Sequence, residues 1–167
     1  MSRTNNSLPR APPILYLPRI MGNPMATRPR RRRSLSDWLL LAEALGTLAL
    51  ASLAIRIVPF RRLAAAASSW GRGASHADPQ MVRRVRGAVQ GWAVRVPWKA
   101  VCFQRGLALH FMLRRRGIAS VLHYGVGRKE ETELAAHVWV NVGGETVIGG
   151  EEAPKFACLA RFPGEAA

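Results

Sequence analysis

Two residues in this chain, Cys102 and His137, stand where they could carry out nucleophilic chemistry. Cys102 begins a run of residues typical of a helix, which Pro97 precedes and Gly117 ends. In the first turn of a helix, unpaired N–H groups and the positive end of the helix dipole favour a thiolate. The ordinary alternative is a buried, unreactive thiol, because free cysteine is among the most often buried residue types.

His137 lies in a stretch with the alternation of a β-strand. We expect this strand to pack against the Cys102 helix and to bring the imidazole within hydrogen-bond reach of the thiol. Such a pair attacks a carbonyl carbon as a thiolate and then protonates the leaving amine. His123, on the preceding predicted strand, is the rival for this role. His76 falls in a predicted loop, and His110 lies two turns further along the Cys102 helix.

The elements that must position these residues are predicted as helices first and strands afterwards. Periodicity and breakers predict helices at about 38–58, capped by Ser36 or Asp37, in the first part of 61–80, over 81–96 and between 97 and 117. Alternation predicts strands at 118–127, 134–142 and 145–148, the last two joined by the turn Gly143-Gly144. This order predicts an α+β fold with the Cys102 helix on one face of an antiparallel sheet.

Charge and composition divide the chain into three predicted parts. Residues 1–33 hold eight arginines and no acidic residue, so +8 of the formal net charge of +15 falls there, and we expect a disordered basic tail. A start at Met25 would remove most of that tail. Residues 34–96 are predicted to form a helical N-terminal part and 97–167 the catalytic core. With 49% apolar residues the chain can fill one hydrophobic core.

Several classes of protein are disfavoured by the sequence. The uncharged run from Ala44 to Ile55 is shorter than the roughly 18 residues that a membrane span needs, and Glu43 argues against a signal peptide. We expect a cytoplasmic protein whose core helix could touch a membrane through its basic flanks. Cys102 and Cys158 form no CxxC motif, so we expect no metal and no cofactor. Cys158 has no histidine close by in sequence, and we expect it to be a structural thiol. No motif indicates specific nucleic-acid binding.

Three stretches of the sequence resemble a known family. Cys-Phe-Gln-Arg-Gly-Leu-Ala-Leu-His at 102–110 is followed by Ala-Ala-His-Val-Trp-Val-Asn-Val-Gly-Gly at 135–144 and Val-Ile-Gly-Gly-Glu-Glu at 147–152. Together they are similar to the transglutaminase-like cysteine protease of lasso peptide biosynthesis, in its stand-alone form without a fused recognition domain. The resemblance runs from about Trp38 to Phe162. It implies a papain- or transglutaminase-like core with Cys102 as the nucleophile and His137 as the general base and acid.

The third catalytic residue departs from the family's pattern. The family's aspartate lies about a dozen residues after the histidine, where this chain has Gly149 and Gly150. Register counted back from the glycine turn sets His137 opposite Gly150. Glu151 is therefore the candidate to orient the imidazole after a register shift or bulge, with Asn141 as a papain-like substitute. Orientation by the backbone or by water is the remaining alternative.

A tetrahedral intermediate also needs donors to its oxyanion. The backbone N–H of Cys102 is the natural first donor, and the Gln104 amide and the Trp98 indole are candidates for a second.

The resemblance further implies three partners. They are a lasso precursor peptide whose leader is removed, a separate leader-recognition protein, and an ATP-dependent macrolactam cyclase that captures the freed amine. Two other functions stay open. The same pair could perform amide transfer or deamidation, or the chain could be a catalytically inactive basic adaptor in a maturation complex.

Overall fold

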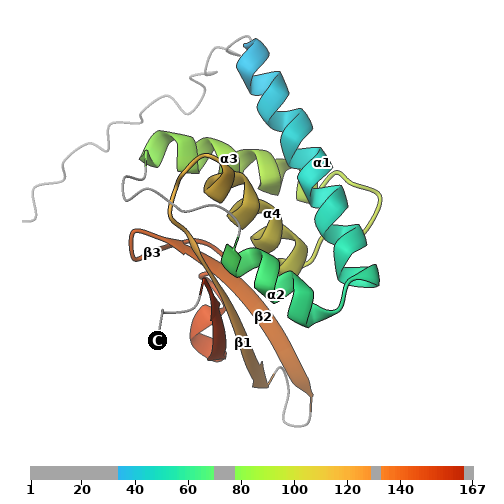
Figure 1. Cartoon of the computed structure of the whole chain (residues 1–167), viewed down its shortest axis with the longest axis vertical. Helices are drawn as coiled ribbons and strands as arrows, with labels where there is room; N and C mark the ends of the chain where they lie inside the picture. The colour runs from blue at the N-terminus through green and yellow to red at the C-terminus, as the bar shows by residue number, and fades with distance from the viewer. Residues whose placement is uncertain (1–33, 70–77, 129–132, 164–167) are drawn as a thin grey trace, which may run out of the picture. The chain divides into compact units, whose positions relative to one another are not determined.

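The computed structural model describes residues 34–69, 78–128 and 133–163, so the predicted basic tail lies outside the described residues. Figure 1 shows helices followed by a sheet, in this order along the chain: α1 (Leu35–Ile57), α2 (Phe60–Ser69), α3 (Pro79–Ala93), α4 (Cys102–Arg115), β1 (Val121–Arg128), β2 (Leu134–Val142), β3 (Glu145–Ile148), the short 3-10 helix η1 (Ala153–Lys155) and β4 (Ala157–Phe162). The predicted α+β fold is confirmed.

Helix α1 begins three residues earlier than predicted. Its cap is Ser34, not Ser36 or Asp37: the Asp37 N–H donates to Ser34 Oγ over 3.3 Å, and the Ser34 N–H donates to Asp37 Oδ2 over 3.0 Å. This reciprocal pair is a capping box, with Asp37 at the third helical position. A carboxylate near the start of a predicted helix therefore need not belong to the capping residue.

Helix α4 has the boundaries that its flanking residues dictate. Cys102 is its first residue, as predicted, and Gly117 adopts a φ of 73° just beyond its end. The N–H of Gly117 donates to the Arg114 carbonyl and that of Ile118 to the Leu113 carbonyl, both over 3.0 Å. Glycine at this position satisfies the last carbonyls of the helix without a steric penalty.

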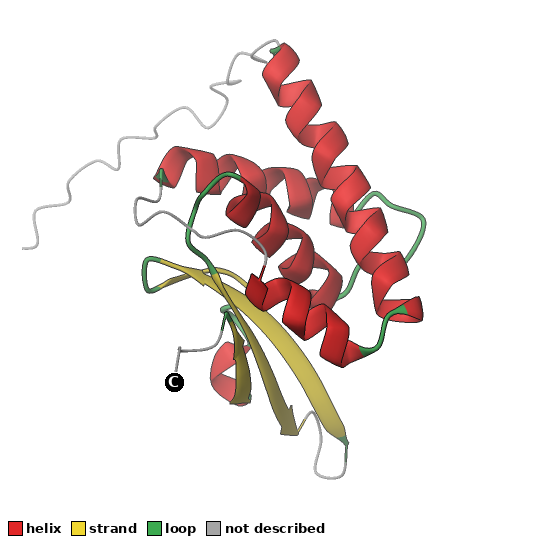
Figure 2. Cartoon of the chain, viewed as in Figure 1, coloured by secondary structure: helices red, strands yellow, loops and turns green. Residues whose placement is uncertain are grey.

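The core lies around α4. Its side chains Leu107, Ala108, Leu109 and Leu113 are almost completely buried. Helices α1 and α3 pack against it on one side, and β2 and β1 on the other. Figure 2 shows the helices α1 to α4 on one face of the sheet. The helix comes so close to β2 that a Cβ added to Gly106 would lie 2.6 Å from Cγ1 of Val138, so a side chain at this position would push the two elements apart.

The sheet has four antiparallel strands in the order β3-β2-β1-β4. The three predicted strands are present, and the turn between β2 and β3 has the positive φ values that its two glycines allow (58° at Gly143, 86° at Gly144). Strand β4 was not predicted. It pairs with the outer edge of β1 and places Cys158 opposite Gly125.

Candidate active site

Cys102 lies at an uncapped helix start. The N-cap residue is Val101, and no side chain accepts a hydrogen bond from the first turn of α4. The N–H groups of this turn are thus not satisfied by a side chain, and a negative charge placed beside them is stabilised. The Cys102 side chain is half-buried and lines a cavity of about 610 Å³. This is the position that the sequence predicted for a reactive thiol.

His137 lines the same cavity and is held by the backbone. Its Nε2 lies 2.8 Å from the carbonyl oxygen of Gly149. A carbonyl oxygen can only accept, so Nε2 carries the hydrogen and, in the neutral ring, Nδ1 has the free lone pair. The residue is 9% exposed, and its ring packs against Phe156, with ring centroids 4.9 Å apart, and against Trp139 at 6.1 Å. One nitrogen is therefore anchored and the other is able to accept a proton.

The two residues reach this cavity from different sides of the sheet. Val138 faces α4, and side chains alternate along a strand, so His137 starts on the opposite face. Strand β3 pairs only with Val140, Asn141 and Val142, which leaves the first part of β2 as an edge where the cavity opens. No hydrogen bond between Cys102 and His137 occurs in the described structure. Strand β2 packs against α4 as expected, but the expected hydrogen bond between the thiol and the imidazole is not formed.

The group that contacts the imidazole is a backbone carbonyl and not a carboxylate. The register shift expected between β2 and β3 is present between Val140 and Asn141, but β3 ends before it reaches Glu151. Glu151 and Glu152 line the cavity with exposed side chains, and Glu152 lies 3.4 Å from Lys155. Asn141 accepts a hydrogen bond from the Thr146 hydroxyl over 3.0 Å and lines another cavity. A catalytic role for Glu151 stays a prediction.

The close contact with His137 and β2 requires a glycine at position 149. Its φ is 78°, and a Cβ added there would lie 2.6 Å from the carbonyl oxygen of Val138 and 3.1 Å from Nε2 of His137. No side chain, including that of an aspartate, fits at this position unless the backbone moves. The close approach of the Gly149 carbonyl to the imidazole therefore depends on glycine.

The predicted oxyanion donors lie in different surroundings. The Trp98 indole N–H donates to Ser52 Oγ over 2.9 Å, which ties it to α1. The side-chain oxygen of Gln104 is buried and has no hydrogen-bond partner. The backbone N–H of Cys102, at the uncapped helix start, is the donor best supported by its surroundings.

Cys158 and His123 are in contact on the face of the sheet that also carries His137. Cys158 Sγ is 3.7 Å from Nδ1 of His123, and the His123 ring stacks on Trp139 with centroids 5.3 Å apart. Burial, and then the nearby Arg161, lower the pKa of His123. Cys158 is exposed, so it is not part of the core, and its assignment as a structural thiol stays a prediction. The unpredicted strand β4 is what brings Cys158 to a histidine that is distant in sequence.

His110 has a structural role. It is completely buried, with Nε2 2.9 Å from the Ala67 carbonyl and Nδ1 3.0 Å from the Ser120 hydroxyl. Burial lowers its pKa to about 4, so the ring is neutral at pH 7. His76 lies outside the described residues.

An apolar cavity of about 330 Å³ adjoins the catalytic candidates. It shares Val101, Cys102, Ala136 and Val138 with the larger cavity. Its remaining walls are apolar and aromatic side chains: Ile55, Val58, Phe60, Leu63, Phe103 and Tyr124. The Cys102 side chain thus stands between a polar and an apolar cavity. Among the described residues, no three His, Cys, Asp or Glu side chains are grouped so that they could hold a metal ion.

Comparison with known proteins identifies the family. The family model of the transglutaminase-like superfamily matches residues 44–161, which is most of the chain, and the protein belongs to this superfamily. Its members are commonly cysteine peptidases or transferases. No curated protein and no solved structure matches the chain significantly. The comparisons therefore define the family and leave the substrate open.

Proposed function

We propose that the protein is a cytoplasmic cysteine peptidase that removes the leader peptide from a lasso precursor. The observation that carries the proposal is the cavity that contains both the Cys102 thiol, at the uncapped start of α4, and the His137 imidazole. Membership in the transglutaminase-like superfamily supports the cysteine chemistry. The sequence resemblance between Pro97 and Glu152 is what favours a lasso precursor as the substrate.

In the proposed reaction, Nδ1 of His137 takes the thiol proton of Cys102 and the sulfur attacks the carbonyl carbon of the scissile bond. The oxyanion accepts a hydrogen bond from the Cys102 N–H. His137 then gives its proton to the amide nitrogen, which leaves as an amine, and water hydrolyses the thioester. The thiol and the imidazole must approach each other for the first step. Catalytic hydrogen bonds are often long without substrate and tighten when it binds.

The two cavities on either side of Cys102 support a peptide as the substrate. The apolar cavity has a volume suited to one large apolar side chain beside the scissile bond. The larger cavity carries charges of both signs, from Arg86, Arg105, Glu151 and Glu152, and suits the more polar continuation of the chain. A separate recognition protein would hold the leader, and a macrolactam cyclase would consume the freed amine.

Amide transfer is the second candidate, because transferases occur in the same superfamily. It would use the same acyl-enzyme, with a primary amine in place of water. The inactive adaptor is the third, and it is favoured because, among the described residues, His137 is bonded to the Gly149 carbonyl and to no carboxylate.

One experiment separates the three functions. The full chain is incubated with the precursor peptide encoded nearest to its gene and with a mixed synthetic peptide library, with and without hydroxylamine, and the products are read by mass spectrometry. Leader release that Cys102→Ala abolishes and Cys158→Ala preserves supports the proposal. Hydroxamates show that an acyl-enzyme forms, in a peptidase or in a transferase. Without hydroxylamine, products joined through an amine of the library at the expense of hydrolysis indicate a transferase. Absence of both products and of an acyl-enzyme indicates the adaptor. Library cleavage without precursor cleavage retains the peptidase and rejects the lasso substrate.

A further inference from the structure

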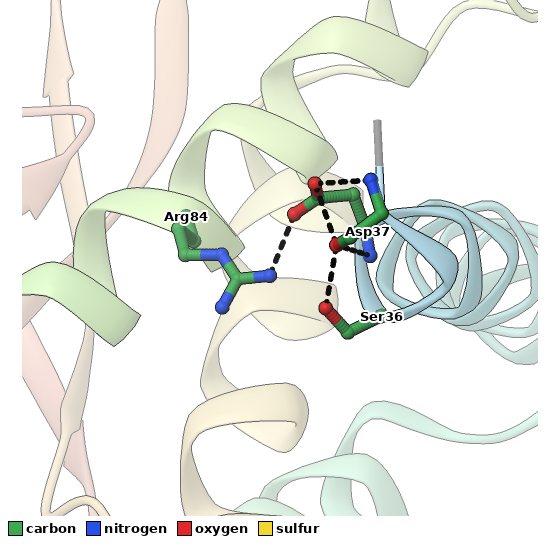
Figure 3. A network of polar contacts seen from close by, with 4 residues as sticks. Ser36, Asp37 and Arg84 are labelled. Carbon is green, nitrogen blue, oxygen red and sulfur yellow. Dashed lines mark hydrogen bonds and ion pairs between the residues drawn. The ribbon is translucent and has the colours of Figure 1, made fainter. Parts of the chain in front are cut away.

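Helix α1 turns both of its acidic side chains toward the protein. Asp37 Oδ1 lies 2.6 Å from Nη2 of Arg84 on α3, beside the capping box (Figure 3). Glu43 binds Arg116 through both carboxylate oxygens and lies 3.3 Å from Arg115. The Arg116 hydrogen bond lowers the pKa of Glu43 more than burial raises it. Both carboxylates of the helix are therefore ionised, and they form ion pairs with arginines of α3 and of the end of α4.

The opposite side of α1 is exposed and apolar. We call this surface the outer stripe; its residues recur at every third or fourth position and are all exposed: Leu35, Leu39, Ala42, Gly46, Leu50, Leu53 and Ile57. It runs along the whole helix without a polar residue. A helix on the surface of a soluble domain normally shows the reverse arrangement, with polar residues outward. Contiguous exposed apolar surface of this kind marks a contact site.

The basic residues at the end of the stripe indicate what covers it. Arg56, at the end of α1, and Arg61 and Arg62, in the first turn of α2, are all exposed. In the sequence, four further arginines immediately precede Ser34. Two copies of a chain with a formal net charge of +15 repel each other, whereas an anionic lipid surface attracts basic groups.

We propose that the outer stripe of α1 binds an anionic membrane surface, with the helix lying flat in the interface. Of the helices that the structure describes, α1 is the one long and apolar enough to cross a membrane by length and composition alone. It does not cross in this fold, because Leu40, Ala44 and Leu48 pack on the other elements and Glu43 is paired with α4. Interfacial helices bury one apolar face and keep basic residues at the headgroups.

The test is co-sedimentation of the full chain with vesicles of phosphatidylcholine alone or with half phosphatidylglycerol. The substitutions Leu39→Gln and Leu50→Gln, at side chains 64% and 68% exposed, remove two leucines from the stripe. The matched control changes Leu134→Gln and Leu159→Gln, which are 74% and 66% exposed on the sheet. We expect the stripe variant to bind anionic vesicles about tenfold more weakly and the control to bind like the parent chain.

A second variant, Arg61→Gln with Arg62→Gln, should weaken binding to anionic vesicles by about tenfold. If the stripe variant has a lower thermal midpoint of unfolding than the parent chain, this second variant still tests the proposal. The proposal is overturned if the parent chain does not bind anionic vesicles, or if the stripe and control variants bind equally, since the basic tail alone would then account for binding. It is also overturned if light scattering shows a dimer that only the stripe variant dissociates, because the stripe is then covered by a second copy.

Discussion

Cys102 and Cys158 each stand near a histidine, but in opposite surroundings. Cys158 is in contact with its histidine, with 3.7 Å between Sγ and Nδ1 of His123, yet it is exposed on an edge strand. Cys102 makes no hydrogen bond to His137, but it is half-buried at an uncapped helix start and shares a cavity with that imidazole. Under the proposed function, the distance between a cysteine and a histidine is the weaker criterion for a catalytic pair. A cavity for substrate and donors for an oxyanion are the stronger criteria.

Substitution of the two histidines should give the largest difference between the two cysteine–histidine pairs. We expect His137→Ala to lower kcat for peptide cleavage by about 10²- to 10⁴-fold, because the general base and acid is lost. His123→Ala should leave kcat within about threefold of the parent value, with thermal midpoints as the folding control. Equal losses in both variants would remove the distinction drawn between the two pairs.

The third histidine, His110, shows how a buried structural histidine behaves. Its pKa in the folded chain, about 4, is below the ordinary 6.5, so the unfolded chain binds the extra proton between these values. Stability should therefore fall as the pH drops from 6.5 through 4, by about 3 kcal/mol in total. Urea unfolding across this range measures the slope, and His110→Gln should reduce it. An unchanged slope would show that another group is responsible.

Gly149 and Gly144 both have a positive φ, but a side chain would meet different surroundings at the two positions. Gly144→Ala incurs only the cost of a left-handed residue, about 1 kcal/mol, since a Cβ there meets nothing within 4 Å. Gly149→Ala must also relieve the contact with the Val138 carbonyl, and we expect a loss of about 2–3 kcal/mol. It should lower activity as well, because the His137 anchor moves. Equal destabilisation of the two variants in urea would contradict the close packing around His137.

The smallest effect concerns the third catalytic residue. If the Gly149 carbonyl is sufficient to orient His137, Glu151→Gln should lower kcat by less than about tenfold, similar to Glu152→Gln. A much larger loss for Glu151→Gln alone, without a change in the thermal midpoint, would show that Glu151 reaches the imidazole during the reaction. The Glu151 prediction would then hold despite the hydrogen bond to Gly149.

Features set by local chemistry could be predicted from the sequence. Pro97, Gly117 and the apolar periodicity between them predict a helix with Cys102 in its first turn, and the two adjacent glycines predict the β2–β3 turn. Alternation also identified the strand of His137. These signals depend on residues that are neighbours in the chain.

Features set by tertiary contacts could not be predicted in this way. The close approach of Gly106 to Val138 decides which face of β2 meets α4, and with it the side from which His137 enters the cavity. The short strand β4 shows little alternation, so its pairing with β1, and the contact of Cys158 with His123, had no local signal. A backbone carbonyl such as that of Gly149 leaves no mark in the sequence as a hydrogen-bond partner.

The most direct test of the proposed Cys102–His137 pair needs no substrate. The rate of iodoacetamide labelling is measured against pH by peptide mass spectrometry, with Cys158 in the same molecule as the internal reference. The pairing predicts that Cys102 labels well below the pH at which an ordinary thiol reacts, and that His137→Ala removes this reactivity while His123→Ala does not. Labelling of Cys102 that follows an ordinary thiol, or that is unchanged in His137→Ala, would contradict the account.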